Sequence, residues 1–259
     1  MLPDRHGIAH PTHKMRWRIF DKNINLSYTY EEIWKTHSEV IEMLISIFDN
    51  DELKFAQLIE EIPNLSSQDR KRVLEWAESI YENVEQIDFS SWESIRKILN
   101  QHRSHPDTDW ALPESELVRL EALYNKLQPT DIINKYKWLF NDHWPDFPEG
   151  FKYVENDYKE RHIQQQNRIN TEREKAIIIL REELGLSRTL DLRKKVKEPW
   201  HLGSALAGII STQDEVLKVC ECLYDDKSTI GFIHNFIFQK SRHEDFNWVK
   251  SLIVAEIFI

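Results

Sequence analysis

Apolar residues recur at three- and four-residue spacing along most of the chain. This spacing places them on one face of an α-helix and leaves polar residues on the opposite face. The run that begins at residue 73 shows the pattern clearly, with Val73, Trp76, Ala77, Ile80 and Val84 on a single face. Similar runs separated by short polar links predict about a dozen helices between residues 29 and 257.

Helix-start signals precede many of these runs. Thr29 and Glu32 form a capping box, in which the hydroxyl accepts from a first-turn amide and the carboxylate reaches back to the cap. Thr212 and Glu215 repeat the same pattern. Pro113 stands where the first turn of a helix tolerates proline. Helices that start and stop this often predict antiparallel hairpins.

We therefore predict an all-α protein of helix hairpins stacked in sequence, an irregular α-solenoid of the HEAT or TPR kind. No clean repeat period is present, so a compact irregular bundle is the alternative. Residues 153–184 predict one long helix, closed by Gly185 as its C-terminal cap and polar enough in its first half to project or bridge. Residues 230–238 alternate as a strand would, but no partner strand is evident, so we predict a buried helix there.

The loop 141–151 interrupts the helical rhythm with two prolines and a glycine. We take it as the boundary between an N-terminal helical subdomain (29–141) and a C-terminal helical subdomain that holds the long helix (152–259). Residues 1–28 form an extended entry segment in this interpretation. Because Met1 leads directly into LPDRHGIAHP and the last residues are the apolar VAEIFI, we expect a fragment of a larger protein.

Composition narrows the possible functions. Hydrophobic residues make up 41% and charged residues 30%, which is typical of a globular protein. Six glycines are few for a nucleotide-binding α/β domain, and no phosphate-binding motif is present, so we expect no cofactor. The net charge of −10 disfavours nucleic acid as a partner. Two cysteines and the lack of a long apolar run predict a cytoplasmic protein without a membrane segment.

Three histidines near the start, His6, His10 and His13, could converge on a metal ion. Zinc needs three or four ligands in tetrahedral geometry, and no fourth ligand accompanies these in a known spacing. Gly7 and Pro11 also argue against a regular helix. Solvated histidines in an entry loop are therefore the stronger interpretation, and a metal site is the alternative.

Cys220 and Cys222 suggest a ligand pair until they are placed on a helix. Residues two apart on a helix point about 200° away from each other, so both sulfurs cannot easily bind one ion. We predict one core cysteine and one that is partly exposed.

A second cluster of imidazoles and carboxylates could perform acid–base chemistry or bind metal. Its members are His102, His105, Asp107, Asp109, Glu114 and Glu116. Each also has a local structural explanation, because imidazole suits a helix C-terminus, aspartate suits a turn, and glutamate suits the first turn of a helix. We prefer the structural explanation.

Arg96 and His102 stand in an Arg-x5-His spacing, which resembles the loose motif of HEPN-type helical ribonucleases. That resemblance implies an RNA-cleaving pair on a helix, completed by dimerisation. The family pattern has a polar residue directly after the arginine, and here that residue is Lys97. A HEPN-like ribonuclease is the one enzymatic alternative.

A contact surface is predicted from aromatic, basic and histidine side chains in loops, where packing does not obviously require them. The members are Trp17, Arg18, His143, Trp144, Phe147 and Phe151. Burial in the core is the competing interpretation for Trp144 and Phe147.

Three stretches, HPTHKMRWRIFD, RSHPDTDWALPESE and DHWPDFPEGF, are similar to the long helical region of large bacterial multidomain proteins such as STAND-type NTPases of anti-phage defence. The resemblance implies a scaffold or sensor whose effector domain lies elsewhere in the polypeptide. We therefore expect a non-enzymatic segment that contacts a protein partner or neighbouring domains of the same polypeptide.

Overall fold

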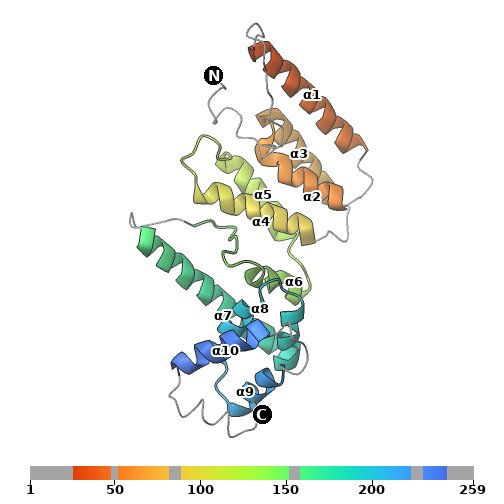
Figure 1. The fold of residues 1–259 in the computed structure, drawn as a ribbon. Coiled ribbons are helices and arrows are strands. Elements are labelled where there is room, and N and C mark those ends of the chain that lie inside the picture. Colours follow the sequence, from red (N-terminus) through yellow and green to blue (C-terminus); the bar gives the residue numbers. More distant parts are fainter. Residues whose placement is uncertain (1–25, 48–51, 82–88, 152–157, 223–229, 244–259) are drawn as a thin grey trace. The chain divides into compact units, whose positions relative to one another are not determined.

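The computed structural model describes residues 26–47, 52–81, 89–151, 158–222 and 230–243. Within these ranges every regular element is a helix, and no strand is present (Figure 1). The predicted all-α class is confirmed. Residues 230–238, which alternate as a strand would, lie in a helix as predicted.

Ten α-helices and three short 3-10 helices make up the described part of the chain. The α-helices are α1 (Leu26–Ser46), α2 (Glu52–Glu61), α3 (Ser67–Tyr81), α4 (Phe89–Ser104), α5 (Glu114–Lys126), α6 (Ile132–Tyr136), α7 (Tyr158–Asp191), α8 (Pro199–Ile209), α9 (Gln213–Glu221) and α10 (Ile230–His243). The 3-10 helices are η1 (Ile62–Asn64), η2 (Lys137–Phe140) and η3 (Leu192–Lys194).

The chain divides into two compact units. Unit 1 comprises residues 1–128 and 146–152, and unit 2 comprises residues 129–145 and 153–259. The loop 141–151, expected as a simple boundary, is therefore shared: its first half belongs to unit 2 and its second half returns to unit 1.

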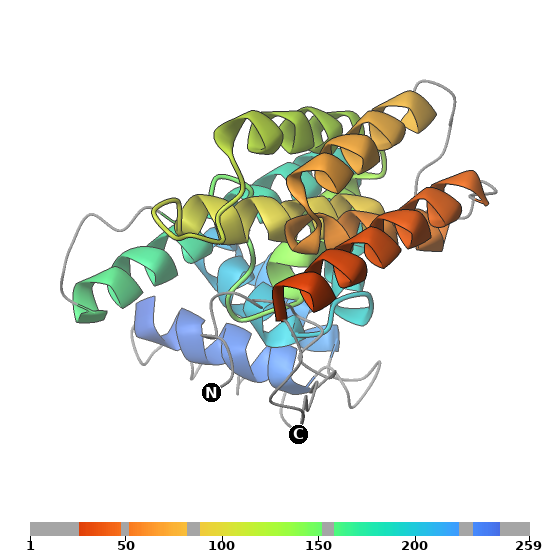
Figure 2. The ribbon, with the colours of Figure 1, turned by 90° about the horizontal axis from the view of Figure 1, so that it is seen from above.

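In unit 1, each helix packs against the next-but-one helix along the chain. α1 contacts α3, α2 contacts α4, and α3 contacts α5. Neighbouring helices also pair, α2 with α3 and α4 with α5. The odd-numbered helices thus form one layer and the even-numbered helices another, and α1 lies at the edge beside α3 (Figures 1 and 2).

The core of unit 1 is apolar and aromatic. Ile59, Leu74, Ile95 and Leu120 are fully enclosed. The Trp92 indole stacks on the Tyr124 ring, with ring centroids 5.0 Å apart. Burial of such side chains is the main stabilising contribution to a fold of this kind.

In unit 2, α8 and α10 form the most extensive helix pair. Gly203 of α8 makes this possible, because a Cβ at that position would lie 2.2 Å from the carbonyl oxygen of Phe232 on α10. Phe232 and Phe236 are fully buried in the same interface. The small residues of GSALAG therefore serve close helix packing.

The predicted long helix is present in the described residues from Tyr158 onward, and residues 153–157 of the prediction lie outside them. Gly185 breaks this element, with φ 77° and ψ 165°, a conformation that only glycine adopts readily. Helical residues continue on its far side to Asp191. The prediction that Gly185 ends the long helix is consistent with this kink.

Two smaller predictions need correction. The first helix begins at Leu26, three residues before the predicted capping residue Thr29. Cys222, expected to be partly exposed, is buried like Cys220. The side chain of Cys222 lies against its own helix, with Sγ 3.7 Å from the carbonyl oxygen of Lys218.

Candidate functional site

A buried arginine organises the first half of the loop 141–151. Arg173 of α7 is 2% exposed, and it donates through Nε to the carbonyl oxygen of Leu139 at 2.8 Å. Its Nη2 donates to the carbonyl oxygens of Asp142 at 2.7 Å and His143 at 3.4 Å. One guanidinium therefore binds three backbone carbonyl groups within residues 139–143, which its planar fork of donors suits well.

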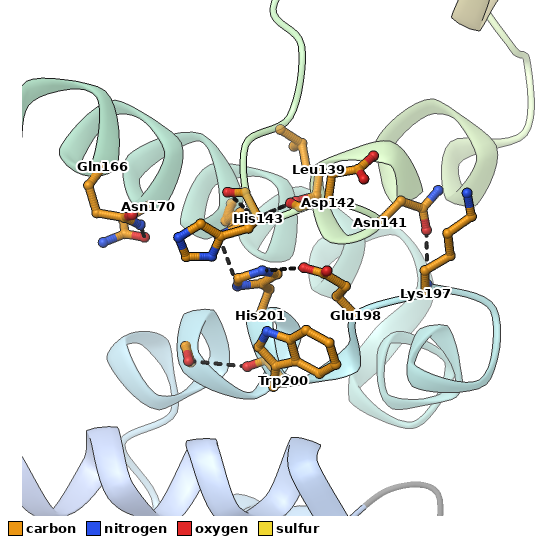
Figure 3. A network of polar contacts seen from close by, with 12 residues as sticks. Leu139, Asn141, Asp142, His143, Gln166, Asn170, Lys197, Glu198, Trp200 and His201 are labelled. Atoms are coloured by element: carbon orange, nitrogen blue, oxygen red, sulfur yellow. Dashed lines mark hydrogen bonds and ion pairs between the residues drawn. The ribbon is translucent and has the colours of Figure 1, made fainter. Parts of the chain in front are cut away.

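The same guanidinium begins a chain of hydrogen bonds that runs through His201 of α8. Arg173 Nη1 lies 3.1 Å from His201 Nδ1, and His201 Nε2 lies 2.7 Å from a carboxylate oxygen of Glu198 (Figure 3). Because arginine can only donate, Nδ1 must accept and Nε2 must carry the proton that it donates to Glu198. His201 is therefore a neutral imidazole.

Electrostatics agree with a neutral His201. The pKa of His201 is lowered to about 3, mainly by burial, with smaller contributions from Arg173 and His143. Burial also lowers the pKa of Arg173 to about 10, although Glu198 acts in the opposite direction. Arg173 thus stays charged at neutral pH. Its counter-ion is the Glu198 carboxylate, to which it is linked by two hydrogen bonds through His201.

Exposed rings surround this network. His143 and Trp144 lie in the loop, His162 projects from α7, and Trp200 from α8. The rings of His143 and Trp144 meet edge to face with centroids 4.9 Å apart, and those of Trp144 and His162 meet in the same way at 4.8 Å. We call the four side chains the Trp144 surface.

The Trp144 surface is joined to the buried network through His201. The His143 and His201 rings lie 5.3 Å apart, and the Trp200 and His201 rings lie 5.6 Å apart (Figure 3). Trp144 and Trp200 are 36% and 38% exposed. Two indole rings are thus exposed to solvent close to the backbone carbonyls that the Arg173 guanidinium binds.

Backbone hydrogen bonds hold α8 to the same segment. The amide of Glu198 donates to the carbonyl oxygen of Phe140 at 3.1 Å, and the amide of Lys197 donates to Asn141 Oδ1 at 3.1 Å. Four of the five guanidinium donor sites of Arg173 are engaged in this arrangement or with His201, and His201 has both ring nitrogens occupied. Neither ring nitrogen of the buried His201 is therefore left without a partner in this network.

The predicted contact residues separate into three groups. His143 and Trp144 are exposed in unit 2, as the prediction requires. Phe147 and Phe151 are buried in unit 1, where their rings pack edge to face, so the expectation that they form an exposed contact surface is wrong. Trp17 and Arg18 lie outside the described residues.

Arg96 of the predicted ribonuclease pair has a structural role. Arg96 is buried, and its Nη1 donates to the carbonyl oxygen of Asp146 at 2.6 Å. Its guanidinium also lies 3.7 Å from the carboxylate of Glu93 one turn away. Arg96 therefore holds the second half of the loop against α4.

His102 also has a structural role. It is 1% exposed, and Nδ1 accepts a hydrogen bond from the amide of Leu112 at 3.0 Å. Burial lowers the pKa of His102 to about 4, with a smaller contribution from the charge of Arg70. His102 is therefore an enclosed imidazole whose Nδ1 is occupied by a backbone amide of its own unit.

The predicted metal sites receive no support in the described part of the chain, where no group of three or more histidine, cysteine, aspartate or glutamate side chains could hold an ion. His6, His10 and His13 lie outside that part. In the second cluster, Glu116 instead accepts from Arg70 at 2.7 Å. The His105 ring packs against Trp110.

No protein-family model, no curated protein and no solved structure matches this chain. None of its described helices is both long and apolar enough to cross a membrane.

Sequence reasoning missed Arg173, His201, Glu198, His162 and Trp200. A signal for the arginine was present: Arg173 falls on the apolar face of its helix, four residues after Ile169 and four before Ile177. A lone charge on such a face must find buried partners. The carbonyl groups that accept its hydrogen bonds lie thirty or more residues away along the chain and could not be identified from spacing.

Proposed function

We propose that this chain is a non-enzymatic helical scaffold that binds a protein partner through the Trp144 surface. The observation that carries the proposal is the exposure of two tryptophans and two histidines beside the buried Arg173 network. Tryptophans at protein interfaces often dominate binding, and their contribution is greatest where they are held in place before the partner arrives.

Charge favours a protein partner over nucleic acid. The chain carries a net charge of −10, and a phosphate backbone would be repelled by most of its surface. The Trp144 surface consists of two indoles and two imidazoles, so none of its four members is an arginine or a lysine. A protein contact with a mixed aromatic and polar character fits this composition best.

The helix packing of unit 1 supports a scaffold role. Alternating helices that contact their next-but-one neighbours are the packing of stacked hairpins, and we propose that unit 1 is a short irregular solenoid. From the sequence resemblance alone we also propose that the chain works within a larger cytosolic bacterial protein.

A site-specific photo-crosslinking experiment in the source organism tests the proposal. A benzophenone amino acid replaces Ile163, which is 53% exposed and directly follows His162 on α7, so the four rings stay intact. The matched control replaces Val118 of α5, which is apolar and 52% exposed. We expect a protein adduct from position 163 that is missing from position 118.

The partner identified in this way is then purified and its affinity for the full chain measured. Trp144→Ala and Trp200→Ala should each weaken binding at least about ten-fold, which corresponds to loss of one hot-spot side chain. The same adducts from both positions, adducts with nucleic acid only, or unchanged affinity in both variants would overturn the proposal.

A further inference from the structure

Helix α1 carries apolar residues on two separate faces. Ile41 is 3% exposed and belongs to the core of unit 1. A second set lies between 39% and 54% exposed, and we call it the α1 stripe: Ile33, Val40, Met43, Leu44 and Ile47, the last in the turn directly after the helix. Scattered single exposures are ordinary, but five on one helix face form a contiguous apolar surface.

The α1 stripe points away from α3. Ser38 marks the side toward α3, because its hydroxyl donates to the carboxylate of Asp69 at 2.6 and 2.7 Å. With about 100° of rotation per residue, Val40 at the centre of the stripe lies about 160° from Ser38 and about 100° from Ile41. The stripe is therefore on the outer side of the layer formed by α1, α3 and α5.

The position of α1 makes an apolar outer face unusual. The end of a stack of helix hairpins normally carries a polar outer face, because no further helix covers it. α1 is the outermost described helix of its layer (Figure 2). Its outer face carries the exposed apolar residues of the stripe. One more helix laid along the stripe would continue the packing that α3 and α5 already show.

Charge at the edge of the stripe indicates which helix would fit. Glu32 and Glu39 are exposed and seven residues apart, so they border the stripe on one side two turns from each other. Glu42 belongs to a different face, where it accepts an ion pair from Arg72 of α3 at 3.0 Å. The one exposed lysine nearby, Lys35, lies farther round the helix from the stripe than either glutamate.

We propose that the α1 stripe binds an amphipathic helix of a partner protein, with an apolar stripe of its own bordered by lysine or arginine. Apolar side chains supply the affinity in this mode of recognition, and the basic edge meets Glu32 and Glu39. A second copy of this chain fits less well, because α1 against α1 would bring acidic edges together. This surface is separate from the Trp144 surface and belongs to the other unit.

Two designed helical peptides test the proposal by fluorescence anisotropy with the full chain. Both carry the same leucine and isoleucine stripe, and they differ only in a lysine border or a glutamate border. We expect the lysine-bordered peptide to bind at least about ten-fold more tightly at low salt, with the preference shrinking as salt screens the charges. The double variant Glu32→Lys/Glu39→Lys should reverse the preference.

A charge-neutral variant isolates the apolar contribution. Val40→Gln/Ile47→Gln changes one exposed position on α1 and one in the turn directly after it, both of which glutamine tolerates. It should weaken binding of the lysine-bordered peptide at least about ten-fold. Val118→Gln on α5 is the matched control and should leave the affinity unchanged.

Other outcomes overturn the proposal. These are equal binding of both peptides, no binding of either peptide, or an unchanged affinity for the lysine-bordered peptide in the Val40→Gln/Ile47→Gln variant. Concentration-dependent dimerisation that Val40→Gln/Ile47→Gln abolishes would assign the stripe to a second copy instead. Circular dichroism of each variant confirms that α1 and its neighbours keep their helical content.

Discussion

In both halves of the loop 141–151, arginine side chains bind backbone carbonyl groups, but the aromatic rings of the first half are exposed and those of the second half are buried. In unit 2, Arg173 binds the carbonyl groups of Leu139, Asp142 and His143, and the side chains of His143 and Trp144 face solvent. In unit 1, Arg96 and Arg103 bind the carbonyl groups of Asp146 and Pro148, and the following aromatic rings are buried. Hydrogen bonds from arginine side chains to a loop therefore do not decide whether its aromatic residues face the core or solvent.

The difference follows from what each half packs against. Along α4, Asn100, Arg103 and Ser104 form a polar row that hydrogen-bonds the second half of the loop, including the amides of Phe147 and Phe151. With the backbone attached along its length, both phenylalanine rings turn inward. In unit 2 the anchor is concentrated at Arg173 and reaches only as far as the carbonyl of His143, so Trp144 lies beyond it.

The largest effect we expect separates the two kinds of aromatic residue. Phe147→Ala should lower the free energy of unfolding by about 3–5 kcal/mol, because it removes a buried ring and leaves a cavity. Trp144→Ala should cost no more than about 1 kcal/mol, since its ring is already partly in water. Urea unfolding of the full chain measures both, and equal costs would contradict the assignment of Phe147 to the core and Trp144 to the surface.

The anchors should also differ in strength. Arg173→Met leaves three backbone carbonyls without their donor, and we expect a loss of about 3 kcal/mol in unfolding free energy. Arg103→Met removes one carbonyl contact and a bidentate pair with the half-exposed Glu121, and should cost about 1 kcal/mol. Denaturant titration ranks the two variants, and a larger loss for Arg103 would show that the anchoring of unit 2 is not concentrated in Arg173.

A glycine in the second half of the loop gives a smaller effect. Gly150 has φ 69°, and a Cβ there would lie 2.8 Å from the backbone of Arg103 and Ser104, so Gly150→Ala should cost about 2 kcal/mol. Gly208→Ala is the control, because its Cβ would meet only the flexible Glu174 side chain at 3.3 Å on an ordinary helix. That variant should be neutral or slightly stabilising. Similar losses in both would mean that the loop of unit 1 is not attached to α4 as described.

Acid should weaken both units gradually. The folded pKa values of His102 and His201, about 4 and about 3, lie below the ordinary value of 6.5, so the unfolded chain binds protons that the folded chain does not. Stability is therefore complete above about pH 6.5 and falls as pH drops toward 4, by at most about 1.4 kcal/mol per pH unit for each histidine. His102→Asn keeps an acceptor for the amide of Leu112 and should flatten this slope, as measured by urea unfolding at several pH values. An unchanged slope would show that His102 is not a source of the acid sensitivity.

The helical class and most helix starts could be predicted, because apolar periodicity and capping residues act locally. Thr212, for example, accepts from the amide of Glu215 as its capping box predicts. The burial of the side chains in the loop 141–151 could not be predicted in this way. His143, Trp144, Phe147 and Phe151 look alike in the sequence, and only distant partners such as Arg173 and Asn100 decide which face solvent.

Only part of the candidate site could be predicted, because its members come from distant parts of the chain. His143 and Trp144 are exposed as the predicted surface requires, but His162 and Trp200 join them from α7 and α8 through tertiary packing that periodicity does not encode. Conversely, Arg96 and His102 match a catalytic spacing and yet bind backbone groups of their own unit. Spacing on a helix shows which residues share a face, and burial then determines the chemistry left to them.

Because both natural cysteines are buried, their thiols should react slowly with labelling reagents. Cys220 and Cys222 are the only two cysteines in the sequence, both are enclosed, and burial raises the pKa of the Cys220 thiol to about 11. A maleimide dye added near neutral pH should therefore react far faster with one cysteine introduced on the outside, for instance at Ile163 or Val118. A spectroscopic reporter can therefore be attached beside the Trp144 surface, or at the control position Val118, without first removing the natural thiols.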